Sequence, residues 1–400
     1  METNSVVKCT GGFMFIWLSI GLVFLTSCSD TGVKGIDGRE RAAPQYIGFE
    51  PTKDYGKELI PDYEKQVITK IIALLSNHLK EQYANTKLLR DTHPKSNGCV
   101  KAEFSVNPNL PEQYRFGIFK ETKTYPAWIR FSNSEPEVTA DQAKDFRGVA
   151  MKLFGVEGER LPVPGDEQHT QDFLFIGFPA FFAGNPVDFL KFFTLAFDNP
   201  DTPKFARTKY FGIRPRALKN ALVGRKQFAN PLEITWFSVA PFLLGPPASE
   251  GNGYAVKYKL ESAYPGTSRI PEKPDYDYLR AAMVNTLSQQ DWYLNFKIQL
   301  QTNPDPKIQP IEDTLTIWDE QQSPFFTVAT IRIPRQQFGS ESQQVFCENL
   351  SFNPWHGLTA HRPIGGINRA RRDVMKAISD LRLQANGIER VEPTGFETFE

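Results

Sequence analysis

The spacing of apolar residues predicts a chain that alternates between helices and short strands. In 63–83 the apolar side chains recur at helical intervals, at Val67, Ile68, Ile71, Ile72, Leu75 and Leu79. In 100–106 they alternate with polar residues, which predicts a strand with one buried face. Short apolar runs between turn-rich loops predict three further strands, at 128–131, 149–154 and 173–176.

The second half of the chain continues this alternation. Residues 186–197 predict a helix because proline is favoured in the first helical turn, and 276–290 predict another. Alternating stretches predict strands at 292–301 and 325–333, and 366–383 read as a basic amphipathic helix. Helix, strands, helix, strands and helix in this order indicate an α+β domain built around an antiparallel sheet or barrel.

The N-terminal leader contains an almost wholly apolar run, FMFIWLSIGLVFL, at 13–25. As a helix this run spans only about 20 Å, so it suits a signal peptide better than a membrane span. The sequence Leu25-Thr26-Ser27-Cys28 that follows resembles a bacterial lipobox. We therefore expect residues 1–28 to be a lipoprotein signal peptide, with lipidated Cys28 anchoring the chain to a membrane of the bacterial cell envelope and the domain facing the periplasm or exterior. The alternative is a short uncleaved anchor with an incidental cysteine.

After the leader, the composition predicts one folded domain. Residues 29–60 are polar, carry Gly and Pro and show no sustained period, which indicates a flexible tether. The predicted domain covers 61–390, and 391–400 form a C-terminal tail. Cys99 and Cys347 are the only cysteines outside the leader, and the sequence leaves open whether they pair.

Composition narrows the function classes. Lys plus Arg and Asp plus Glu both number 46, so the net charge is zero and nucleic acid is not an expected partner. The 32 phenylalanines suit a large apolar core and would also suit a pocket for a flat or lipidic ligand. The sequence contains no Gly-rich phosphate loop, H-E-x-x-H, paired C-x-x-C or G-x-S-x-G motif. Its five histidines make a multi-histidine metal site unexpected.

Five segments, taken in order, carry a family resemblance. They are Arg90-Asp91-Thr92-His93-Pro94-Lys95, Trp128-Ile129-Arg130-Phe131-Ser132-Asn133, Asp145-Phe146-Arg147-Gly148-Val149-Ala150-Met151-Lys152, Thr170-Gln171-Asp172-Phe173 with Phe181-Phe182 after it, and Phe352 through Arg372. In this order they resemble the haem catalases, and they are most similar to the short catalase-related proteins. The resemblance covers roughly 60–390 and implies a catalase-like antiparallel β-barrel with surrounding helices, with haem as cofactor.

The resemblance also implies roles for individual residues. His93 would be the distal base, and the hydroxyl of Thr92 could hydrogen-bond His93 or a bound ligand, as in relatives that act on fatty-acid hydroperoxides. Thr170 or Gln171 would replace the hydrogen bond of the distal asparagine. Arg90 and Arg130 would be propionate-binding or structural arginines, and Phe181 or Phe182 would pack against the porphyrin. Arg371, in the C-terminal segment, would also bind the cofactor.

On the proximal side the sequence departs from the family. Catalases bind iron through a tyrosine four residues after an arginine, and counting from Arg371 leads to Met375. The metal ligand could be Met375, or His356 or His361 could reach the iron, or no residue could bind it. We expect a haem-binding protein that reduces or rearranges hydrogen peroxide or organic and lipid hydroperoxides. The sequence leaves open whether this protein forms oligomers. The alternative is a non-catalytic lipoprotein of the same fold that serves as a binding or scaffold module.

Overall fold

An antiparallel barrel forms the centre of the computed structural model, which describes residues 54–163, 167–197, 209–247, 250–251 and 253–399. Eight strands follow one another in the order β5-β4-β3-β2-β1-β9-β8-β7, and β5 pairs back onto β7 to close the ring. The short strand β6 adds to β7. The strands are β1 (Ser96–Val106), β2 (Thr124–Ser132), β3 (Gly148–Phe154), β4 (Thr170–Ile176), β5 (Trp236–Phe237), β6 (Phe242–Leu244), β7 (Tyr254–Ser262), β8 (Trp292–Leu300) and β9 (Phe326–Ile333).

The two faces of each strand separate the barrel core from the outer surface of the wall. In β1 the alternating residues of the sequence pattern point into the core, and so do Ala127, Ile129 and Phe131 of β2. Aromatic rings fill the interior, where the ring centroids of Phe104 and Phe296 lie 5.2 Å apart. The barrel interior is therefore a packed core, and the outward faces of the strands are left to build other contacts.

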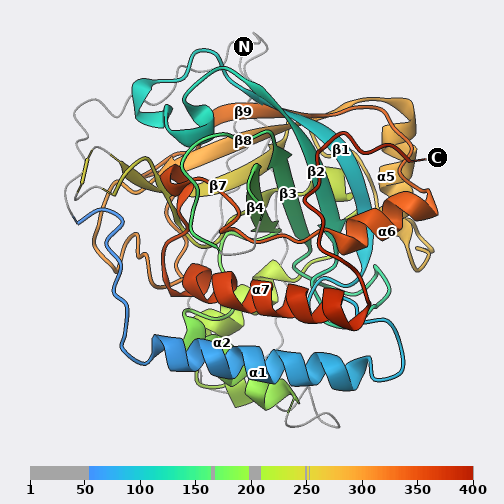
Figure 1. Ribbon diagram of the computed structural model, residues 1–400, viewed down its shortest axis with the longest axis horizontal. Helices are drawn as coiled ribbons and strands as arrows, with labels where there is room; N and C mark the ends of the chain where they lie inside the picture. Colours follow the sequence, from blue (N-terminus) through green and yellow to red (C-terminus); the bar gives the residue numbers. More distant parts are fainter. Residues whose placement is uncertain (1–53, 164–166, 198–208, 248–249, 252, 400) are drawn as a thin grey trace, which may run out of the picture. The chain divides into compact units, whose positions relative to one another are not determined.

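Three helices pack together on one side of the barrel. These are α1 (Glu64–Gln82), α2 (Pro186–Phe197) and α7 (Gly366–Ala385), and α1 contacts both of the others (Figure 1). The remaining described helices of comparable length are α4 (Pro215–Gly224), α5 (Tyr278–Gln289) and α6 (Glu341–Asn349). The expected α+β barrel with surrounding helices is confirmed. Within the described ranges, no helix is both long and apolar enough to cross a bilayer.

A buried ion network joins α1 to α7. The guanidinium of Arg369 lies 2.6 Å from the Glu64 carboxylate, 2.5 Å from that of Glu58 and 2.9 Å from that of Glu312. Three carboxylates around one planar cation fix the two helices to each other and to the segment before α1. Glu58 belongs to the predicted tether, most of which lies, like the leader and Cys28, outside the described residues, so these boundaries stay predictions.

The two cysteines of the domain form a disulfide. Cys99 of β1 and Cys347 of α6 are bonded across 248 positions of sequence. Both are buried beside Trp128, whose indole Nε1 donates to Glu397 over 2.9 Å. The pairing that the sequence left open therefore exists, and it attaches α6 to the barrel wall.

Candidate functional site

A cavity of about 370 Å³ lies between the outer face of β2, β3 and β4 and the three packed helices. Its walls are mostly apolar, with charged side chains gathered on one part. Eight residues singled out from the sequence line it, namely Arg90, Thr92, His93, Arg130, Phe181, Phe182, Arg371 and Met375. The structure thus brings into one place residues that lie up to about 285 positions apart in the sequence.

Small residues on β3 leave space for the cavity above the outer face of this strand. The strand register sets Arg130 beside Ala150, and Ala150 beside Leu174. In the next row, Ser132 lies beside Gly148. A glycine and an alanine at the middle strand leave room for close approach from above, which is the usual structural reason for glycine within a strand.

His93 occupies that room over Gly148. A Cβ built on Gly148 would lie 2.4 Å from Cε1 of His93, so only glycine permits this packing. The imidazole Nδ1 lies 3.0 Å from Oγ of Ser132, whose hydroxyl also lies 3.4 Å from the carbonyl oxygen of Gly148. The backbone of His93 has φ 65°, a left-handed conformation that costs free energy for a non-glycine residue.

Burial keeps the His93 imidazole neutral. Burial lowers its pKa to about 4, a shift that Asp145 opposes and Arg130 reinforces. When Nδ1–H donates to this hydroxyl, the neutral imidazole has its lone pair on Nε2. The side chain can therefore act as a proton acceptor throughout the physiological pH range.

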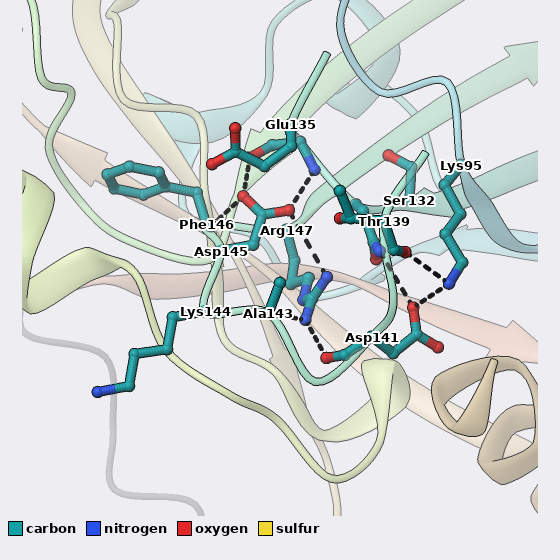
Figure 2. A network of polar contacts seen from close by, with 12 residues as sticks. Lys95, Ser132, Glu135, Thr139, Asp141, Ala143, Lys144, Asp145, Phe146 and Arg147 are labelled. Atoms are coloured by element: carbon teal, nitrogen blue, oxygen red, sulfur yellow. Dashed lines mark hydrogen bonds and ion pairs between the residues drawn. The ribbon is translucent and has the colours of Figure 1, made fainter. Parts of the chain in front are cut away.

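A polar network in the loop before β3 holds this arrangement (Figure 2). Asp145 accepts from the backbone N–H groups of Ser134 and Phe146, at 2.6 and 2.7 Å. Arg147 donates to the carbonyl oxygens of Asp141 and Ala143, at 2.6 and 2.8 Å. Arg147 also has positive φ, 54°, directly before Gly148. The Asp-x-Arg-Gly part of the sequence motif therefore shapes the backbone on which His93 rests.

Three guanidiniums surround one carboxylate at the charged part of the cavity. We call Arg90, Arg130 and Arg382 the arginine cluster; their guanidinium nitrogens lie 3.9, 3.5 and 3.6 Å from the carboxylate oxygens of Glu348. Arg130 also donates to the His93 carbonyl oxygen over 2.9 Å. Burial and the neighbouring arginines lower the pKa of Arg130 to about 9. The cluster carries more positive than negative charge in a desolvated place, which favours an anionic ligand.

Two residues of this region were missed by sequence reasoning. Arg382 lies on α7 two turns beyond Met375, and helical spacing from Arg371 and Met375 could have found it. Asp91 was quoted within the first motif without a role. It lines the cavity, burial raises its pKa to about 7, and its Oδ1 has no hydrogen-bond partner among the described residues.

Aromatic side chains close the remaining wall. The rings of Phe181 and Phe182 lie 4.4 Å apart, and Phe182 lies 4.5 Å from Phe192 of α2. Arg371 and Met375 of α7, one turn apart, also line the cavity. Burial lowers the pKa of Arg371 to about 10, so its guanidinium is charged at neutral pH.

Other candidates from the sequence lie elsewhere. Oε1 of Gln171 accepts the backbone N–H of Leu358 over 3.0 Å, and Gln171 is not among the cavity-lining residues. Nε2 of His361 accepts from the N–H of Ile118 over 3.0 Å. Nδ1 of His356 lies 2.9 Å from Asp172. Neither histidine lines the cavity.

Around His356, three potential metal ligands converge, namely Glu167, Asp172 and His356 itself. The Nζ of Lys152 contacts Glu167 and lies 2.7 Å from Asp172. Its ammonium lies between the two carboxylates and offsets one of their two negative charges, so the protein itself already supplies a cation to this buried cluster.

Comparisons with known proteins show the fold. No protein-family model and no curated protein matches the sequence. A fungal catalase matches with a TM-score of 0.59 and 16% identity, covering 80% of this chain and 63% of that one. Catalase A from Saccharomyces cerevisiae gives 0.56 and 17%, with 78% and 63% covered. A bacterial catalase gives 0.56 and 15%, with 88% and 64% covered. The chain has the catalase fold, as predicted, and spans less than two thirds of the length of these catalases.

Proposed function

We propose that this chain binds haem in the cavity and reduces or rearranges hydrogen peroxide or organic and lipid hydroperoxides. The observation that carries the proposal is the neutral imidazole of His93, which lines a cavity walled by aromatic rings and arginines. A planar apolar ring with carboxylate side groups matches such a cavity in shape, polarity and charge.

The residues present fit haem at the distal and anionic positions. Nε of Arg130 is buried and has no partner among the described residues, so a carboxylate of the ligand could satisfy it. Arg90, Arg130 and Arg382 would hold the propionates, and Phe181 and Phe182 would pack against the ring. Met375 lines the cavity from α7 and would be the donor to the iron, and a thioether is a neutral, soft ligand.

The chemistry of the chain's own residues follows from His93. Bound haem would supply the redox centre for cleaving the O–O bond. Nε2 of His93 would accept the proton of the hydroperoxide and return it to the departing oxygen, which then leaves as water or an alcohol. Thr92 lines the same cavity, and its hydroxyl would orient the substrate oxygen. The packed phenylalanines would exclude water.

An absorption spectrum of the full chain tests this proposal. The protein should be purified in mild detergent after growth with supplied haem. A stoichiometric Soret band, together with peroxide consumption that falls about 10²–10⁴-fold in His93→Ala, is the expected result. His169→Ala is the matched control because His169 is exposed and does not line the cavity. A folded protein without a Soret band would contradict haem binding.

A second candidate is a non-catalytic binding or scaffold module of the same fold. Met375 favours it, since no described cavity-lining residue is a tyrosine and a thioether donates less electron density than a phenolate. Met375→Tyr and Met375→Leu separate the candidates. If Met375→Tyr binds haem where the natural chain does not, the module is supported. If the natural chain binds haem and Met375→Leu shifts its spectrum, Met375 is the ligand.

We further propose that lipidated Cys28 anchors the chain at the bacterial cell envelope. The leader sequence supports this, and so does the disulfide, because such bonds persist mainly in oxidising compartments. The mass of the N-terminal peptide from membrane-extracted protein tests it, with Cys28→Ser as control. An unmodified N-terminus would contradict the anchor. Oligomerisation stays a prediction.

A further inference from the structure

Helix α4 carries an exposed apolar face that the proposed site does not use. Leu222 is 70% exposed and Leu218 37%, one helical turn apart, and Val223 beside them is 44% exposed. Just before the helix, Ile213 is 73% exposed. Large aliphatic side chains gathered on one short segment indicate a surface that is covered in use.

The opposite face of α4 is buried against the cavity. Ala217, Asn220 and Ala221 are buried, and Ala221 lines the cavity. The side-chain amide of Asn220 donates to the carbonyl oxygens of Phe181 and Leu315, at 2.9 and 3.1 Å. These contacts hold the helix in place, so its outer face is a fixed part of the folded surface.

The charges of this segment are all of one sign. Residues 209–226 contain six basic residues and no acidic one, although the whole chain is neutral. Three of the six are paired with acidic residues of other segments, namely Arg214, Arg216 and Arg225. The side chains of Lys209, Lys219 and Lys226 have no ion pair within the described part of the chain, and all three are exposed.

We propose that the outer face of 209–226 docks onto the surface of a bilayer rich in anionic phospholipid. Aliphatic side chains flanked by lysines match the interface, where the apolar groups enter the acyl boundary and ammonium groups meet phosphates. The exposed aliphatic residues favour this partner over nucleic acid, because binding to a phosphate backbone is driven by charge and gives these side chains no apolar surface to enter. This contact is separate from the Cys28 anchor. It brings the wall of the cavity that contains Phe211, Ala221 and Arg225 to the membrane.

Hydrogen–deuterium exchange of the full chain in nanodiscs tests the docking. Amides of 209–226 should exchange several-fold more slowly in phosphatidylglycerol-containing discs than in pure phosphatidylcholine discs. Peptides from α5 are the control and should exchange at the same rate in both kinds of disc. Helix α5 also exposes an aliphatic residue, Val284, but it does not lie in a segment rich in basic residues. The double variant L218S/L222S and the variant Lys219→Glu should each lose the lipid-dependent slowing, while Val284→Ser should keep it.

Two outcomes would overturn the proposal. One is equal exchange of 209–226 in both kinds of disc. The other is slowing that appears in lipid-free detergent and grows with protein concentration, because a second copy of the chain would then be the partner. The readout does not depend on haem, so failure of the proposed function leaves it interpretable.

Discussion

Nδ1 of His93 and Oγ of Ser132 lie 3.0 Å apart, above the glycine of the neighbouring strand. When Nδ1–H donates to the hydroxyl, the hydroxyl can donate to the Gly148 carbonyl oxygen 3.4 Å away. In this arrangement the imidazole Nδ1–H and the serine hydroxyl each donate one hydrogen bond, and the lone pair on Nε2 stays free. With this direction of hydrogen bonding, the serine at the end of β2 accommodates the tautomer that a general base requires.

Replacing Gly148 should displace His93. The methyl group of Gly148→Ala would meet the imidazole at 2.4 Å, so the ring must leave its place. We expect peroxide-dependent activity to fall nearly as far as in His93→Ala, about 10²–10⁴-fold, with the protein still folded. Gly339→Ala is the control because a Cβ there has nothing within 4 Å. Unchanged activity in Gly148→Ala would show that the His93 position is not needed.

The pH profile of activity should follow the low pKa of His93. Because its pKa lies at about 4, the imidazole stays neutral and able to accept a proton until the pH falls near that value. We expect activity of the haem-loaded protein to have its acid limb near pH 4, well below the ordinary histidine range. Initial rates between pH 3.5 and 8 measure this. An acid limb near pH 6.5 would indicate an exposed base and contradict the assignment.

Asp91 should make stability fall as the pH rises toward neutrality. Its carboxyl has a folded pKa of about 7, raised by burial from 3.8. Between these values the folded state holds a proton that the unfolded state has lost, so rising pH favours unfolding by up to about 1.4 kcal/mol per pH unit. Urea titrations at pH 5 and pH 7.5 should show this loss, and Asp91→Asn should reduce it. The same loss in Asp91→Asn would assign the effect to other groups.

Removing the disulfide should destabilise the domain without altering its fold. The bond between Cys99 and Cys347 closes a loop of 248 positions, and loss of such a constraint typically costs about 2–5 kcal/mol. The double variant C99S/C347S avoids a free buried thiol and should unfold at lower urea concentration than the oxidised protein. The natural protein after mild reduction should unfold at the same urea concentration as the double variant. Equal stability of the two proteins would mean that the bond is not formed in solution.

Long, strongly patterned segments allowed most of the fold to be predicted. The helix expected at 186–197 has those bounds in α2, and the strand at 292–301 differs from β8 by one residue. Strands β5 and β6 escaped prediction because two or three residues carry no measurable period. Strand β7 was missed although apolar and charged residues alternate over 256–261, so the period of a strand was present in the sequence.

The candidate site was only partly accessible from sequence. Motif order was enough to identify eight of the residues that line the cavity, since local segments such as Arg90 to His93 keep their spacing. Arg382 and Glu348 meet through packing of α6 and α7, which no sequence period encodes. The exposed face of α4 was also missed. The exposure of Leu222 depends on which side of a short helix the cavity occupies.

Strand β5 has the fewest residue pairs with its neighbours in the barrel. Strand β5 meets β4 through the single pair Ile176 and Phe237, and meets β7 through two pairs, whereas β7 and β8 share seven. Local opening costs least free energy where few ladder hydrogen bonds must break. The pairings of β5 with β4 and β7 should therefore open before the rest of the barrel. Because Leu174 and Ile176 of β4 belong to the cavity wall, opening of these pairings would widen the cavity while the other strands stay joined.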